Sequence, residues 1–135
     1  MATREFEASH IHQRAVKAIE GLPIRIEERW VEICKDNYAS QGRYYESLNT
    51  RLFTRWGWRK KVEQRPFDQY VQETKTEEDY WGYNQYDLLV ARFNDDLYEL
   101  RRLRNLAEAN DLAGKNVRIS DKDFQTIRFY EKYAP

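Results

Sequence analysis

The sequence predicts an all-α fold: a single-domain bundle of four to six helices, with an irregular aromatic-rich segment around residues 57–84. Only 5 glycines and 3 prolines interrupt the 135 residues, and straight side chains, which lose little rotamer freedom in a helix, are common. Apolar residues recur every three or four positions along most of the chain. Aromatic residues make up 15% of the chain and bury enough area for a core. A chain of this length is expected to form one domain, residues 1–135.

The N-terminal half predicts two or three helices. A first helix is expected from about Arg4 to Glu20. Residues 21–23, Gly-Leu-Pro, should interrupt it, because proline lacks an amide donor and disfavours helix in the residue before it. A second helix is expected from about residue 24 to residue 39. The apolar spacing continues to Trp56, so residues 24–56 form either one long helix or two.

The segment after Gly57 is the least regular part of the sequence. Pro66 suits the first turn of a short helix. Residues 76–79, Thr-Glu-Glu-Asp, are typical of a helix start, with a capping residue followed by acids in the first turn.

The strongest helical pattern covers about residues 85–112, which we expect to be the central element of the bundle. Gly114 is a suitable stop for that helix. Residues 116–119 are expected to be extended, and Ser120 should cap a last helix over residues 121–133.

The charges are sorted along the chain, although the net charge is zero. Residues 43–62 hold six basic residues and one acid, whereas residues 63–99 hold ten acids and three basic residues. Fourteen of the 20 aromatic residues lie between Tyr38 and Tyr98. A basic aromatic segment (residues 43–61) therefore precedes an acidic aromatic block (residues 63–99), and two such surfaces favour recognition of a macromolecule.

The acidic aromatic block carries the first functional hypothesis, a non-enzymatic protein that engages and blocks or modulates a protein partner. Tyrosine and tryptophan are enriched at interface hot spots, and acids around them steer toward a partner with a basic surface. This charge-segregated composition is typical of small phage or mobile-element accessory proteins that act as inhibitors. The expected partner-binding residues are Tyr70, Tyr80, Trp81, Tyr83, Tyr86, Glu77, Glu78 and Asp79.

The basic aromatic segment carries the alternative, binding of single-stranded nucleic acid. Bases stack on aromatic rings while cations hold phosphates, and this segment interleaves both residue types. The zero net charge counts against this alternative, as does neutralisation of the segment by the acidic block within the same chain. Its expected residues are Arg51, Arg55, Trp58, Arg59, Lys60 and Lys61.

No pattern in the sequence predicts catalysis, a metal or a cofactor. Glu7 and His10 have the Glu-x-x-His spacing of di-iron bundles, but the second such motif is missing. No phosphate-binding glycine loop occurs. A small enzyme with a carboxylate-lined pocket remains a second alternative, because acid–base catalysis depends on spatial arrangement.

The remaining features concern the compartment and the assembly. Cys34 is the only cysteine, so no internal disulfide forms, and its apolar surroundings predict a buried thiol. The chain shows no signal peptide and no run of 18 apolar residues. A cytoplasmic protein without a membrane partner is therefore expected. Self-association through the apolar stripe of residues 86–107 is a further alternative.

Overall fold

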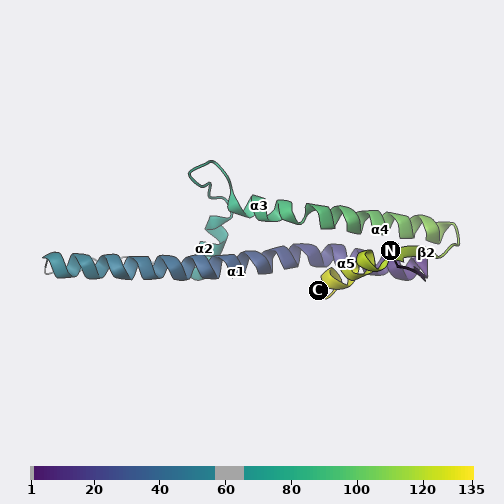
Figure 1. The fold of residues 1–135 in the computed structure, drawn as a ribbon, viewed down its shortest axis with the longest axis horizontal. Helices are drawn as coiled ribbons and strands as arrows, with labels where there is room; N and C mark the ends of the chain where they lie inside the picture. The colour runs from purple at the N-terminus through teal and green to yellow at the C-terminus, as the bar shows by residue number, and fades with distance from the viewer. Residues whose placement is uncertain (1, 57–65) are drawn as a thin grey trace. The chain divides into compact units, whose positions relative to one another are not determined.

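The computed structural model describes residues 2–56 and 66–135, with side chains for residues 2–39 and 66–135. These residues are mostly helical, which confirms the predicted all-α class (Figure 1). The elements in order are β1 (Thr3–Phe6), α1 (Ala8–Trp56), α2 (Phe67–Thr74), α3 (Gln85–Arg92), α4 (Asn94–Leu112), β2 (Val117–Ser120) and α5 (Asp121–Glu131).

The chain has two compact units. Unit 1 comprises Met1–Glu28 with Leu89–Pro135, and unit 2 comprises Arg29–Leu88. The prediction that the chain forms one domain stays a prediction.

The N-terminus of unit 1 is a strand where the sequence predicted a helix from Arg4. Strand β1 pairs antiparallel with β2, in a register that places Thr3 opposite Ser120. The Phe6 ring stacks on the Phe124 ring at 4.9 Å between centroids. These partners lie more than a hundred residues away in the sequence, so local periodicity could not reveal them. The prediction of a helix from Arg4 was therefore wrong, and α1 begins at Ala8.

The predicted interruption at residues 21–23 was also wrong, because α1 runs without a break from Ala8 to Trp56. Residues 24–56 are therefore one helix. Pro23 is exposed, while Leu22 and Ile26 on either side of it are buried. Burial of such side chains gains about 1.5–3 kcal/mol each, which offsets a proline cost of about 3 kcal/mol in a helix interior.

Gly21 serves close packing. An ideal Cβ at this position would lie 2.0 Å from the carbonyl oxygen of Tyr130. Helix α1 therefore approaches the C-terminal end of α5 so closely that only a residue without a side chain fits there.

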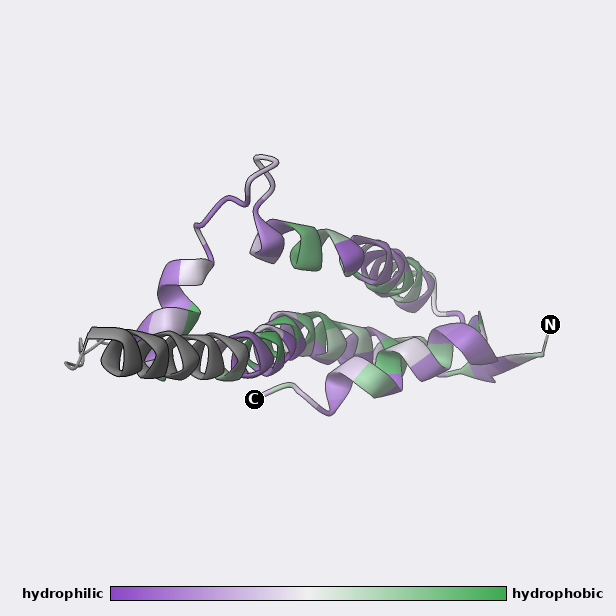
Figure 2. Cartoon of the chain, turned by 60° about the vertical axis from the view of Figure 1, so that its left-hand side comes forward, coloured by the Kyte–Doolittle hydropathy of each residue, from purple (hydrophilic) through white to green (hydrophobic). Residues whose placement is uncertain are grey.

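The core of unit 1 joins α1, α4, β2 and α5. Hydrophobic segments along the helices are green in Figure 2. The hydroxyl of Tyr130 in this core donates a hydrogen bond to the Asp96 carboxylate. Burial and that carboxylate raise the pKa of Tyr130 above its ordinary value, so the hydroxyl stays protonated and remains a donor. The buried side chains include Ile11, Ala15, Ala18, Leu22, Leu100, Leu103, Ala107, Val117, Ile119, Phe124, Ile127 and Tyr130.

The C-terminal elements follow the sequence prediction closely. The predicted helix over residues 85–112 is present, with a turn only at Phe93 between α3 and α4. Gly114 ends it with a positive φ of 67°. Residues 117–120 are extended, and the Ser120 hydroxyl accepts a hydrogen bond from the Asp123 amide at 3.1 Å. The prediction that Ser120 caps the last helix is confirmed.

Unit 2 is built on α1 and the short helix α2, which starts after Pro66 as predicted. Trp30 and Cys34 of α1 are buried, as are Tyr70 and Val71 of α2. The Trp30 indole Nε1 donates to the carbonyl oxygen of Val71 at 3.1 Å. Cys34 is a buried free thiol, as predicted.

The two helix-breaking residues of α1 should respond in opposite ways to alanine. Gly21→Ala should lower the free energy of unfolding by about 1–3 kcal/mol, because the new Cβ meets the Tyr130 carbonyl. Pro23→Ala should raise it by about 1–3 kcal/mol, because a helical amide is restored at an exposed position. Urea denaturation of both variants checks this. Helix propensity alone predicts that Gly21→Ala stabilises, so a gain there would contradict the close approach of α1 and α5.

Candidate functional site

The candidate site is the segment that joins α2 to α3, residues 75–84, which we call the 75–84 turn. The prediction that residues 76–79 start a helix was wrong. Glu78 instead forms an antiparallel bridge with Asn84, and the helix starts at Gln85. The side-chain oxygen Oδ1 of Asn84 accepts a hydrogen bond from the Asp87 amide at 2.8 Å, so Asn84 is the residue that caps α3.

Asn84 also closes the turn at its base. Its side-chain amide donates to the carbonyl oxygens of Lys75 at 2.7 Å and Glu77 at 3.0 Å. One side chain thus ties both ends of the turn together and begins the following helix.

Asp79 organises the tip of the turn. One carboxylate oxygen accepts from the backbone amides of Trp81 at 2.9 Å and Tyr83 at 3.0 Å. The other accepts from the Gln85 side chain at 2.8 Å. The Asp79 amide in turn donates to the Tyr83 carbonyl at 2.8 Å, and Gly82 takes a positive φ of 80°. A glycine is favoured at that position, because other residues rarely adopt positive φ.

This network leaves three large rings facing solvent. Tyr80 is 93% exposed, Trp81 is 77% exposed and Tyr83 is 58% exposed. The rings of Tyr80 and Trp81 meet edge to face at 5.3 Å between centroids. Exposed aromatic side chains on an ordered turn are typical of a recognition surface.

The hydrogen bonds to the Asp79 carboxylate also set its charge state. The Tyr83 amide is the largest cause, followed by the Trp81 amide and the Gln85 side chain, and together they lower the pKa of Asp79 below its ordinary value despite some desolvation. Asp79 therefore stays ionised in neutral solution.

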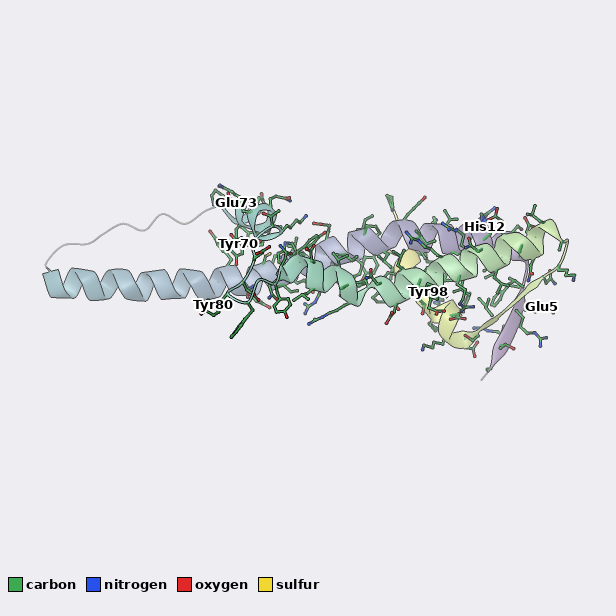
Figure 3. All side chains as sticks on the ribbon, turned by 90° about the horizontal axis from the view of Figure 1, so that it is seen from above. Glu5, His12, Tyr70, Glu73, Tyr80 and Tyr98 are labelled. Carbon is green, nitrogen blue, oxygen red and sulfur yellow. The ribbon has the colours of Figure 1, made fainter. Side chains whose placement is uncertain are left out.

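The other residues of the first hypothesis divide between surface and core. Glu77 and Glu78 are exposed residues of the turn itself. Tyr86 is half-buried and packs edge to face on Trp30 at 5.3 Å. Tyr70 is only 4% exposed and belongs to the core of unit 2, so its ring is not available to a partner. Figure 3 labels Tyr70 on α2 and Tyr80 in the turn.

The residues of the nucleic-acid hypothesis fall outside the described side chains. Arg51 and Arg55 lie on α1. Trp58, Arg59, Lys60 and Lys61 lie outside the described residues. That hypothesis stays a prediction.

The described parts of the chain show neither a metal-binding cluster nor a membrane-spanning helix. Among them, no group of three or more histidine, cysteine or acidic residues is arranged to hold a metal ion. Within the same parts, no helix combines the length and the apolar character needed to span a membrane.

Sequence reasoning missed the structural roles of Asp79, Asn84 and Gln85. The signal was present in the order Asp-Tyr-Trp-Gly-Tyr from residue 79, because aspartate followed by glycine three residues later is typical of a tight turn. The same acids also suit the first turn of a helix, so local sequence alone does not distinguish the two structures.

Comparison of the chain with protein-family models, with curated proteins and with solved structures gives no match.

The order of the 75–84 turn should depend on the charge of Asp79. The pKa of Asp79 is lowered in the folded state. The stabilising effect of its ionised carboxylate is therefore complete above the ordinary pKa of 3.8, and it is lost as the pH falls through the folded-state pKa. NMR shifts of the Trp81 and Tyr83 amides should therefore change with a midpoint below 3.8. The step should be absent in Asp79→Asn, which has no carboxyl to titrate. A midpoint at or above 3.8, or a step that survives in this variant, would contradict the network.

Proposed function

We propose that this chain is a non-enzymatic binding protein that engages a protein partner through the 75–84 turn. Tyr80, Trp81 and Tyr83 make the central contacts, and Glu77 and Glu78 face a basic surface of the partner. The observation that carries the proposal is that three exposed rings project from a turn whose backbone is held by hydrogen bonds from the Trp81 and Tyr83 amides to the Asp79 carboxylate.

Preorganisation supports this proposal energetically. Binding through a flexible loop costs the entropy of ordering that loop, and each immobilised side chain adds about 0.5–1.5 kcal/mol. The Asp79 and Asn84 hydrogen bonds order the backbone before the partner arrives. Tyrosine and tryptophan then supply large contact areas with few rotatable bonds.

The charge around the rings supports a basic partner. Between residues 75 and 87 the chain has four acidic residues and one basic residue, Lys75. Acidic groups at the rim of an interface accelerate encounter with a positive surface and disfavour acidic partners.

The proposed effect on the partner is to block or modulate it. A basic surface that binds nucleic acid is one target of suitable charge, and its occupation by the acidic turn would compete with phosphate. This is the mode of action proposed for an accessory inhibitor of the phage or mobile-element kind.

The test is the double variant Trp81→Ala with Tyr83→Ala. The hydrogen bonds of the turn use the backbone amides of these residues, so alanine removes the rings and leaves the network in place. Partner binding should weaken about 1,000-fold, because two hot-spot side chains contribute about 2 kcal/mol or more each. The measurement is calorimetric titration of a purified partner, first found by site-specific crosslinking from position 81.

The matched control is Tyr98→Ala on α4, which removes a tyrosine that is 68% exposed in unit 1. The affinity of the Tyr98→Ala variant for the partner should equal that of the unaltered protein. Affinity should also fall with added salt, because charges at an interface rim are screened. Equal affinities for the double variant and the unaltered protein would refute the proposal.

A further inference from the structure

An open cleft lies along helix α5 in unit 1, with Asp96 of α4 in its wall; we call it the α5 cleft. Its volume of about 790 Å³ lies within the range of ligand-binding sites in proteins. Lys122, Phe129 and Lys132 all line it. They are spaced seven and three residues apart, so they share one face of the helix.

The acids and the cations of α5 are treated differently by the fold. Each of its three acids forms an ion pair with an arginine of another element. The pairs are Asp121 with Arg4 at 3.1 Å, Asp123 with Arg102 at 3.0 Å, and Glu131 with Arg14. The negative charge of this helix is therefore neutralised within unit 1.

The cations of the same segment are all exposed and all line the cleft: they are Lys122, Arg128 and Lys132. Among the residues that the structure describes, none of the three has a carboxylate partner. Asp96, which also lines the cleft, already accepts a hydrogen bond from the Tyr130 hydroxyl. The cleft is therefore a local excess of positive charge, although the net charge of the chain is zero, and it suits an anion.

The spread of these cations favours an anion with several charges. Lys122 and Lys132 lie ten residues apart, which is about 15 Å at a helical rise of 1.5 Å per residue. A single phosphate cannot contact both side chains at once, so a chain of phosphates matches the cleft better than an isolated ion.

The ring of Phe129 distinguishes between chain-like anions. Phe129 lies between Lys122 and Lys132 along the helix and is 39% exposed. The Lys132 ammonium lies 4.6 Å from the ring centroid. A flat group that packs on the exposed part of the ring therefore has a cation beside it. Nucleobases stack on aromatic rings while cations hold their phosphates, whereas the carboxylates of an acidic peptide gain nothing from a ring.

We propose that the α5 cleft binds single-stranded nucleic acid, with Lys122, Arg128 and Lys132 on its phosphates and a base on Phe129. The cleft belongs to unit 1 and the 75–84 turn to unit 2, so this inference does not rest on the proposed function. It also uses other residues than the basic aromatic segment (residues 43–61).

The first measurement is fluorescence anisotropy of a labelled oligothymidylate of about eight nucleotides, titrated with the full chain. We expect a dissociation constant of about 0.1 mM at physiological salt. The logarithm of the association constant should fall against the logarithm of the salt concentration with a slope of about −2, because each phosphate contact on a single strand contributes about −0.7. No saturable binding, or a slope near zero, would overturn the proposal.

NMR of the unaltered chain, labelled with ¹⁵N, locates the oligothymidylate without any substitution. The side-chain amide of Gln125, which lines the cleft, should shift as the oligonucleotide is added. The side-chain amide of Asn37 in unit 2 should not shift. The opposite pattern would place the nucleic acid outside the α5 cleft and refute the site.

Two triple variants with the same net charge separate this site from general attraction. The cleft variant combines Lys122→Gln, Arg128→Gln and Lys132→Gln. The control variant removes three exposed cations of unit 1 outside the cleft, by Arg101→Gln, Lys115→Gln and Arg118→Gln. The cleft variant should lose at least about tenfold in affinity and most of the salt dependence, and the control variant should keep both. Equal losses in the two variants, or retained binding in the cleft variant, would refute the site.

Phe129→Leu tests whether the ligand is a nucleic acid. Leucine keeps an apolar side chain beside Tyr130 and Tyr133 but has no flat face for a base. Affinity for oligothymidylate should fall about tenfold with the salt slope unchanged. A glutamate peptide of the same length should bind the unaltered chain more weakly than oligothymidylate. Equal affinities for the two ligands, or no effect of Phe129→Leu, would show a site for acidic peptides and contradict the proposal.

Discussion

The rest of the structure depends on the continuity of helix α1 through Pro23. The same helix supplies buried residues to both compact units, Ala18 and Leu22 to unit 1 and Trp30 to unit 2. A proline in a helix interior costs about 3 kcal/mol, and the buried side chains around it gain a similar amount. Gly21 adds the second condition, since any side chain there would collide with the Tyr130 carbonyl of α5. Packing therefore decides the course of this helix against its local preferences.

Trp30 connects that helix to the candidate site. Its indole donates to Val71 on α2, and its ring contacts Tyr86 on α3. These two residues lie on either side of the 75–84 turn, so one buried tryptophan holds both ends of the segment that Asp79 and Asn84 then order. Because the ends are fixed, the remaining loop is short and its ordering costs little entropy. An exposed aromatic surface can persist there without collapsing into the core.

The sequence allowed prediction wherever local chemistry and packing agree. Ser120 and Gly114 carry strong capping signals, and both function as expected. Prediction failed where a distant contact overrides the local signal, as at Gly21 and in strand β1, whose partner is β2. Prediction also failed at residues 76–79, where the same residue types suit both a helix start and a turn. Exposure of Tyr80, Trp81 and Tyr83 depends on that turn, whereas Tyr70 is buried on α2, where its ring packs on Tyr38 of α1. The pattern of aromatics alone could not separate the two groups.

The central claim is that the 75–84 turn is ordered before any partner binds. Backbone ¹⁵N relaxation of the free protein measures this directly, because order parameters report motion on the picosecond to nanosecond timescale. The account predicts values for residues 79–83 close to those of helix α3, about 0.85. Values below about 0.6 for Trp81 and Tyr83, with a rigid α3, would show a flexible loop and contradict a preformed recognition surface.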